Sequence, residues 1–405
     1  MFVGPINRIK SFTLVELLIV IAILAVLAAA VVIVLNPAEL LAQARDSQRI
    51  TDLKTLKDAI DIFVVDNPSA SLGTSQKVYV SLPDTSSTCA NISLPTLPAG
   101  WTYNCVTTEN LRNTDGTGWV PLNLGTIFGG TPIPYLPLDP QNDATLTKYY
   151  AYIPGGSYVL TSLMESEKQA KAALADGGMD PGRFEVGSDL ALWTEASGLV
   201  GYWPFDGIGL ISDGQTAGIQ DISGNSNDGT AYNVNGVGMT FTTGKVGNAI
   251  QFDGIDDYVG TGKILLTGSL PFTMTGWVSV ATSGSTKGFW GQNDYAEFGL
   301  SNSTTVNCWT SSGRTVSFQN PPTGTWHYHT VSWSASGLKL YMDGVEVAAS
   351  SPGGTITNSA YNFNIGGGGI WAATGGYLNG SIDDVRVYDR ALSAAEIRSL
   401  YNATK

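Results

Sequence analysis

The chain opens with an apolar run long enough to form a membrane-spanning helix. Residues 12–35 number 24, and only Thr13 and Glu16 among them are polar. A helix of about 20 apolar residues spans a hydrocarbon core. A carboxylate within such a segment costs a few kcal/mol in lipid, so Glu16 needs a partner there.

Beyond this run the pattern becomes amphipathic. Apolar residues recur at steps of three and four and predict one buried helical face: Leu40, Leu41, Ala44, Leu53, Leu56, Ile60, Phe63 and Val64. The other face carries charges: Arg45, Asp46, Arg49, Asp52, Lys54, Lys57, Asp58 and Asp61. Pro37 lacks a backbone donor and predicts a kink, and Asn67-Pro68 predicts the end of the helix. The amphipathic half is expected to pack against a globular head.

Helical periodicity vanishes after the helix. From about Ser69 to Leu192, Pro, Gly, Thr and Tyr dominate. The segments 149–152 and 158–161 predict two strands around the turn Pro154-Gly155-Gly156.

From about Ser197 the chain predicts many short strands separated by Gly, Asn, Asp and Ser turns, which is typical of a sandwich or jelly roll. Polar and apolar residues alternate in 330–334 and 338–342, and Asp343-Gly344 predicts a hairpin turn. Ser393 followed by Glu396 predicts a capping box at the start of a last helix.

The composition argues against several classes of function. The 405 residues include 48 Gly, only 14% are charged, and the net charge is −13. This charge argues against binding nucleic acid through a basic patch and against an anionic membrane surface. With only 2 His, a histidine-based metal enzyme is not expected.

The string Lys10-Ser11-Phe12-Thr13-Leu14-Val15-Glu16-Leu17-Leu18 resembles the start of a type IV pilin or pseudopilin precursor. In that family a prepilin peptidase cuts before the Phe, the new amino terminus is methylated, and the fifth mature residue is Glu. The resemblance implies a leader of residues 1–11, cleavage between Ser11 and Phe12, and an assembly role for Glu16, which pairs with the terminal amine of a neighbouring subunit. This chain has Ser11 where the family usually has Gly.

Two other interpretations of the N-terminus stay open: a secretory signal peptide cut after Ala28-Ala29-Ala30, and a plain membrane anchor. Neither accounts for the whole motif around Glu16. In an exported segment, Cys89 and Cys105 are expected to form a disulfide, with two free thiols as the alternative. Cys308 is expected to be a buried small hydrophobe.

The C-terminal half resembles the laminin G-like, concanavalin A-like jelly roll of bacterial surface proteins. The matching strings include Tyr202-Trp203-Pro204-Phe205-Asp206, residues 221–229, 246–254, 257–259 and 272–278, and Gly380–Ser393. The family often carries a structural Ca²⁺ between its opening and closing strands, so the resemblance implies a site at Asp206, Asp221, Asn225, Asp228 and Asp384.

The same resemblance implies binding of a carbohydrate or glycoprotein through exposed aromatic side chains. The candidates outside the clearest strand motifs are Trp290, Tyr295, Trp309 and Trp371. Catalysis is not expected, because the Glu-x-Asp-x-x-Glu motif of the fold's glucanases is absent and the adjacent Asp383 and Asp384 face opposite sides of a strand.

The expected architecture is an α+β pilin-like N-terminal part with a long N-terminal helix, followed by an all-β concanavalin A-like jelly roll. Its expected segments are a leader (1–11), a long helix (12–66) with a transmembrane half (12–35), a globular head (67–195) and the jelly roll (196–405). We expect a structural subunit of a type IV pilus-like filament with an adhesive domain, inserted in the cytoplasmic membrane and then displayed at the cell surface. The alternatives are a pseudopilin of a type II secretion or DNA-uptake system and a secreted glycan-binding protein.

Overall fold

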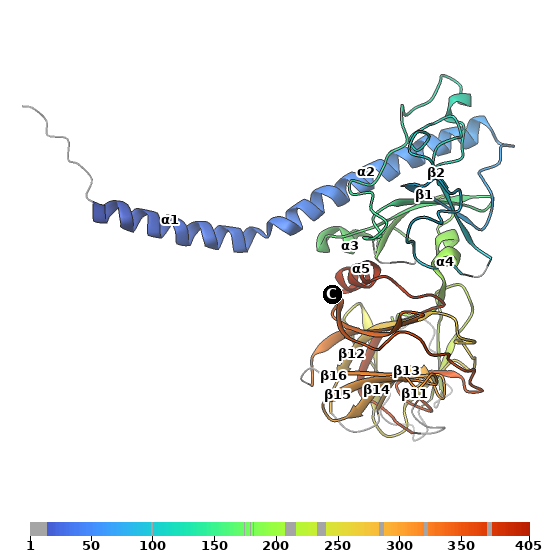
Figure 1. Ribbon diagram of the computed structural model, residues 1–405. Coiled ribbons are helices and arrows are strands. Elements are labelled where there is room, and N and C mark those ends of the chain that lie inside the picture. The colour runs from blue at the N-terminus through green and yellow to red at the C-terminus, as the bar shows by residue number, and fades with distance from the viewer. Residues whose placement is uncertain are drawn as a thin grey trace, which may run out of the picture.

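The computed structural model describes residues 14–98, 100–173, 175–178, 180, 182–206, 216–232, 240–282, 287–319, 323–370 and 375–405. Two helices lead into a head built on one sheet, and a sandwich of two further sheets follows (Figure 1). The helices are α1 (Leu14–Leu35) and α2 (Pro37–Asp66).

The break between α1 and α2 is at Asn36, whose φ is +38°. The residue before a proline avoids the helical conformation, and Pro37 has no N–H to continue the hydrogen-bond ladder. Pro37 therefore stands at the first position of a new helix, and the Asn36 side chain accepts a hydrogen bond from the Glu39 N–H. The predicted interruption at Pro37 is confirmed, and α2 ends before Asn67 as expected.

Over the described residues, the head sheet has the order β2-β1-β3-β4-β5, with β1 and β2 parallel and the other neighbouring pairs antiparallel. Its strands are β1 (Lys77–Pro83), β2 (Thr102–Val106), β3 (Tyr150–Pro154), β4 (Tyr158–Leu163) and β5 (Arg183–Gly187). Short helices accompany it: η1 (Leu124–Thr126), α3 (Glu167–Ala173) and α4 (Ala191–Ser197).

The two faces of the head sheet pack on different partners because side chains alternate along a strand. Tyr150 and Tyr152 point to α2, where they meet Leu56 and Ile60. On the other face, Ile153 lies in a second apolar cluster that includes Leu192 and Trp193.

In the described residues, the sandwich consists of two eight-stranded sheets. The inner sheet has the order β19-β18-β17-β12-β21-β10-β9, with β6 also paired to β21. Its strands are β6 (Leu199–Trp203), β9 (Thr240–Thr243), β10 (Asn248–Asp253), β12 (Phe272–Val280), β17 (Trp326–Ser334), β18 (Gly337–Met342), β19 (Val345–Ala349) and β21 (Asn379–Tyr388).

The outer sheet has the order β16-β15-β14-β13-β20-β11-β8-β7. Its strands are β7 (Thr216–Ile219), β8 (Gly229–Tyr232), β11 (Tyr258–Gly260), β13 (Lys287–Gln292), β14 (Ala296–Asn302), β15 (Thr305–Thr310), β16 (Thr315–Gln319) and β20 (Phe363–Ile365). Apolar residues from both sheets, among them Trp203, Phe298 and Ile382, form the core between them.

The last helix, α5 (Ala394–Thr404), covers the other face of the inner sheet and also contacts α3 of the head. Ile397 and Leu400 of α5 pack on Trp277 and Tyr328 of that sheet. The predicted capping box of Ser393 and Glu396 is confirmed. Because α5 lies between the sandwich and the head, the outer sheet is on the far side of the sandwich from the head (Figure 1).

Candidate functional site

The apolar N-terminal segment forms α1, and Glu16 lies in its first turn. The side chains of residues 14–25 are all exposed, including Leu14 (79%) and Leu24 (58%). Ser11 and Phe12, the expected processing residues, lie outside the described residues. In the part of the chain that the structure describes, no helix is both long and apolar enough to cross a membrane.

A buried charge network fixes α2 to the head. Arg49 is fully buried and donates from Nε and Nη2 to both carboxylate oxygens of Asp139, at 2.6 and 2.9 Å. Its Nη1 donates to Asp46 at 2.7 Å and also contacts Glu165. Burial alone would lower the pKa of Arg49, but the hydrogen bonds and negative charges of Asp139 and Glu165 together outweigh burial and raise that pKa.

Asp46 extends this network to the start of α3. Its Oδ2 accepts hydrogen bonds from the backbone N–H and the hydroxyl of Ser166, at 2.8 and 2.7 Å. The sequence pattern had placed Asp46 and Arg49 on the solvent face of the helix, and this expectation is wrong. Their partners lie about 90 and 120 residues further along the chain, where helical periodicity gives no information.

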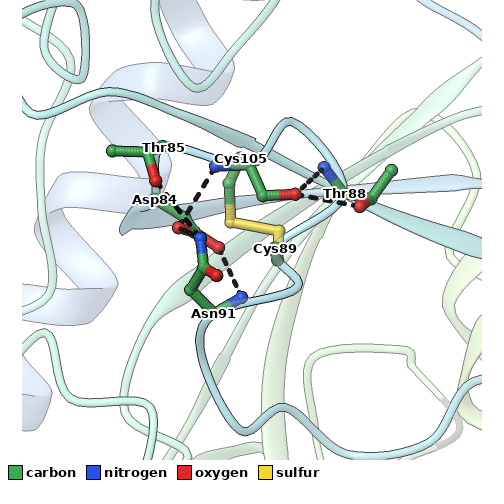
Figure 2. The surroundings of a disulfide bond; sticks show 7 residues. Asp84, Thr85, Thr88, Cys89, Asn91 and Cys105 are labelled. Atoms are coloured by element: carbon green, nitrogen blue, oxygen red, sulfur yellow. Dashed lines mark hydrogen bonds between the residues drawn. A yellow bond between two sulfur atoms is a disulfide. The ribbon is translucent and has the colours of Figure 1, made fainter.

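The structure joins Cys89 and Cys105 in a disulfide (Figure 2). Beside it, Asp84 accepts hydrogen bonds from the backbone and the side chain of Asn91, at 3.0 and 2.8 Å. These bonds, with that from the Asn91 side chain the strongest, lower the pKa of Asp84. The disulfide therefore ties the loop after β1 to β2. Cys308 is buried, as expected from the sequence.

A second buried charge cluster lies between the head and the sandwich. Glu396 of α5 accepts from Arg183 of β5 at 3.2 Å and from Arg390 of the sandwich at 2.8 Å. Burial would raise the pKa of Glu396, but the charges of Arg390 and Arg183 lower it to about 2. Ser399 of α5 lies 2.8 Å from Met164 O and 2.6 Å from Gly182 O. The two parts are thus joined by buried polar contacts.

The residues that the sequence suggested for Ca²⁺ are occupied by hydrogen bonds of the fold. Both oxygens of Asp221 accept bonds, from the N–H groups of Tyr202, Ser223 and Asn227 and from the Ser223 hydroxyl. Asp228 accepts from the Asp221 N–H at 2.8 Å.

The other three suggested ligands also form hydrogen bonds within the fold. Asp384 accepts from the Tyr202 hydroxyl and from Arg386, Asn225 donates to Leu199 O, and Asp206 accepts from the Asn248 N–H. Asp384 is buried beside Tyr202, whereas Asp206 is exposed. The structure therefore assigns each of the five side chains a role in holding loops and strands.

Two of the four aromatic candidates belong to the core. Trp290 is 0% exposed and Tyr295 is 1% exposed, and both lie in the apolar cluster between the sheets. Their expected role in stacking on a ligand is wrong, because neither ring has a face open to solvent. Trp290 lies on β13 and Tyr295 lies in the turn between β13 and β14, and the sequence around them did not define where these strands begin and end. Trp371 lies outside the described residues.

Among the three candidates that the structure describes, Trp309 is the one at the surface. It lies on β15, opposite Glu297 of β14 and Thr315 of β16, on the face of the outer sheet turned away from the core. These residues line an open depression of about 470 Å³ together with Asp294, Ser301 and Asn307. An aromatic ring flanked by carboxylate, amide and hydroxyl groups suits a sugar ring, which has apolar faces and hydroxyl edges. The sequence could not single out its neighbours, because they come from separate strands.

Two segments of the chain match known families. Residues 6–32 match the prokaryotic N-terminal methylation motif, and residues 253–398 match the concanavalin A-like lectin/glucanases superfamily. The chain therefore joins a prepilin-type N-terminal motif to a concanavalin A-like domain, as expected from the sequence. No curated protein sequence matches the chain.

Several solved structures are similar to part of this chain. Domain 4 of AbnA, an extracellular GH43 arabinanase from Geobacillus stearothermophilus solved with arabinotriose, is 19% identical, and the match covers 50% of this chain and 97% of that chain with a TM-score of 0.40. The binding domain of Paraclostridial Mosquitocidal Protein 1 is 16% identical (50% and 52%, TM-score 0.37), and Trypanosoma rangeli sialidase with sialic acid is 11% identical (66% and 50%, TM-score 0.39). The match thus spans only about half the length of these last two chains.

Proposed function

We propose that this protein is a pilin-like subunit of a surface filament and that its sandwich binds a carbohydrate or glycoprotein outside the cell. The match of residues 6–32 to the methylation motif carries the proposal. The exposed apolar surface of α1 supports it, since such a surface needs lipid before assembly and neighbouring helices afterwards. The role is one of binding and assembly rather than catalysis.

In this account Glu16 pairs with the amino terminus of a neighbouring subunit. A carboxylate that moves into an apolar environment costs a few kcal/mol unless a positive charge meets it. Processing before Phe12 would create that positive charge, four residues before Glu16. The charge pair would thus set the register between adjacent α1 helices.

Replacement of Glu16 by alanine or glutamine is expected to abolish incorporation into filaments, because both variants remove the charge that meets the terminal amine. Immunoblotting of the sheared surface fraction against the membrane fraction measures the effect. The control is Asp58→Ala, which removes an exposed carboxylate of α2 outside the apolar segment and should leave incorporation unchanged. Normal incorporation of Glu16→Gln would rule out the charge pairing.

The sandwich displays its candidate ligand-binding face outward. The inner sheet is covered by α5, whereas the outer sheet, with Trp309, is turned away from the head (Figure 1). A depression of a few hundred Å³ is within the range of small-ligand sites.

Replacement of Trp309 by alanine is expected to weaken glycan binding at least about tenfold, because truncating an aromatic anchor commonly costs 2 kcal/mol or more. The full chain, purified in detergent, would be applied to a glycan array and its hits titrated. Tyr135→Ala, which removes an exposed ring from the head (63% exposed), is the matched control. Equal binding by the Trp309 variant and the unmodified chain would exclude this face as the ligand site.

A further inference from the structure

The turn between β10 and β11 gathers three carboxylates. Asp253, Asp256 and Asp257 each offer an oxygen, and these oxygens all lie within 4.8 Å of one another. The backbone enforces the arrangement: the Asp253 N–H donates to Asp257 Oδ2 at 3.0 Å, and Asp253 Oδ1 accepts from the Ile255 N–H at 2.7 Å. Gly254 has a φ of +83°, which closes the turn.

The carboxylates retain buried oxygens that the fold does not satisfy. Asp257 is 0% exposed, and its Oδ1 is buried without a hydrogen-bond partner. Asp256 Oδ1 is likewise inaccessible and without a partner. Buried polar atoms are nearly always paired, and a buried charge costs more than a buried dipole when it is left alone. The two bare oxygens therefore indicate a missing positive partner.

The protein itself does not supply that partner. Across the described ranges, no ion pair includes any of the three carboxylates. The amino group of Lys287 lies nearby but contacts Gly254 O, at 3.5 Å.

The spacing suits calcium. Two oxygens that bind one Ca²⁺ at 2.3–2.6 Å lie at most about 5 Å apart, and Ca²⁺ accepts irregular sets of carboxylates and water. Mg²⁺ requires near-octahedral ligands at 2.0–2.1 Å and retains its water, so a preformed three-carboxylate turn suits it less well.

We propose that Asp253, Asp256 and Asp257 form a Ca²⁺ site at the rim of the sandwich. It is distinct from the site that the sequence suggested at Asp206, Asp221, Asn225, Asp228 and Asp384. The expected dissociation constant is about 10⁻⁴–10⁻³ M, as in extracellular modules with few charged ligands.

The ion would also order the neighbouring part of the outer sheet. Tyr258 directly follows the turn and stacks on Tyr232, with ring centroids 4.7 Å apart. Tyr258 also lies against the glycine-rich segment after β20, where a Cβ on Gly368 would come within 2.3 Å of its ring. This ordering of the outer sheet by Ca²⁺ would not depend on assembly of the chain into a filament.

The test is calcium titration of the full chain in detergent, after treatment with EDTA, by isothermal titration calorimetry and by thermal unfolding. One Ca²⁺ should bind per chain and raise the melting temperature. Asp256→Asn should weaken binding at least about tenfold, since it removes one charged ligand without changing its size. In EDTA the same variant should melt at an equal or higher temperature than the unmodified chain, because like charges have been reduced, and this result would separate loss of binding from misfolding.

Asp206→Asn distinguishes the two possible sites. This exposed carboxylate belongs to the set that the sequence suggested, and its removal should leave calcium affinity unchanged. Loss of binding in Asp206→Asn with retention in Asp256→Asn would overturn the proposal. Absence of any heat or melting shift at about 10 mM Ca²⁺, tenfold above the weak end of extracellular sites, would overturn it as well.

Discussion

Replacement of Arg49 by alanine is expected to lower the free energy of unfolding by about 3–5 kcal/mol. The guanidinium is fully buried and is the shared partner of Asp46, Asp139 and Glu165. Its removal would leave a bidentate carboxylate, Asp139, buried without a counter-charge. The loss would also free α2 from the loop before β3 and from the start of α3, so the helix would be less firmly fixed to the head.

Urea unfolding of the full chain in detergent, followed by tryptophan fluorescence, measures this effect. Arg45→Ala is the matched control, because Arg45 pairs with Glu165 from a side chain that is 30% exposed. Partly exposed pairs contribute about 1 kcal/mol or less. If the two variants lost the same stability, the buried network would not be what fixes α2 to the head.

Replacement of Glu396 by alanine is expected to cost a similar 3–5 kcal/mol and to separate the unfolding of the head from that of the sandwich. Glu396 is 3% exposed and is the common partner of Arg183 in the head and Arg390 in the sandwich. Without Glu396, the buried guanidinium groups of Arg183 and Arg390 lose their shared counter-charge between the head and the sandwich. The capping box of α5 is also lost. Differential scanning calorimetry should show a single transition for the unmodified chain and two for the variant.

Lys405→Ala is the control, because it removes an exposed ion pair between the head and the C-terminal end of the chain. Lys405 pairs with Glu167 of α3, but Glu167 is 55% exposed, so the variant should retain the single transition. Two transitions in both variants would show that general contact area, rather than the buried cluster, couples the two parts.

Low pH should weaken the contact between the head and the sandwich. The pKa of Glu396 falls to about 2 in the folded chain, from about 4.5 in an unfolded one. A carboxyl with a lowered folded pKa stabilises the fold above its unfolded pKa and loses that contribution as the pH falls toward the folded pKa. The coupling between head and sandwich should therefore decline between about pH 4.5 and 2, and Glu396→Ala should lack this dependence.

The sequence predicted those parts of the fold that local pattern determines. Leu53, Leu56, Ile60 and Phe63 were assigned to one helical face, and all four are buried against the head. By contrast, Leu40 and Leu41 were assigned to the same face and are 50% and 60% exposed. Periodicity gives the direction of a face but not how far along the helix a partner extends.

The candidate functional residues depend on contacts between residues far apart in the sequence, and for these the sequence was less informative. Arg49 was expected in solvent because its partner Asp139 lies 90 residues away. Trp290 and Trp309 looked equivalent in the sequence, but their strand positions place one in the core and the other on the outer sheet. The three carboxylates of the β10–β11 turn are close together in the sequence, but the sequence does not show that oxygens of Asp256 and Asp257 are buried without a hydrogen-bond partner.

The most direct test of the filament account is the mature amino terminus, determined by mass spectrometry on material sheared from the cell surface. The account predicts a chain that begins at methylated Phe12, with Glu16 as its fifth residue. A chain that begins at Val31 would contradict it, because signal-peptide cleavage would remove Glu16 and release a secreted protein whose function rests on the sandwich alone.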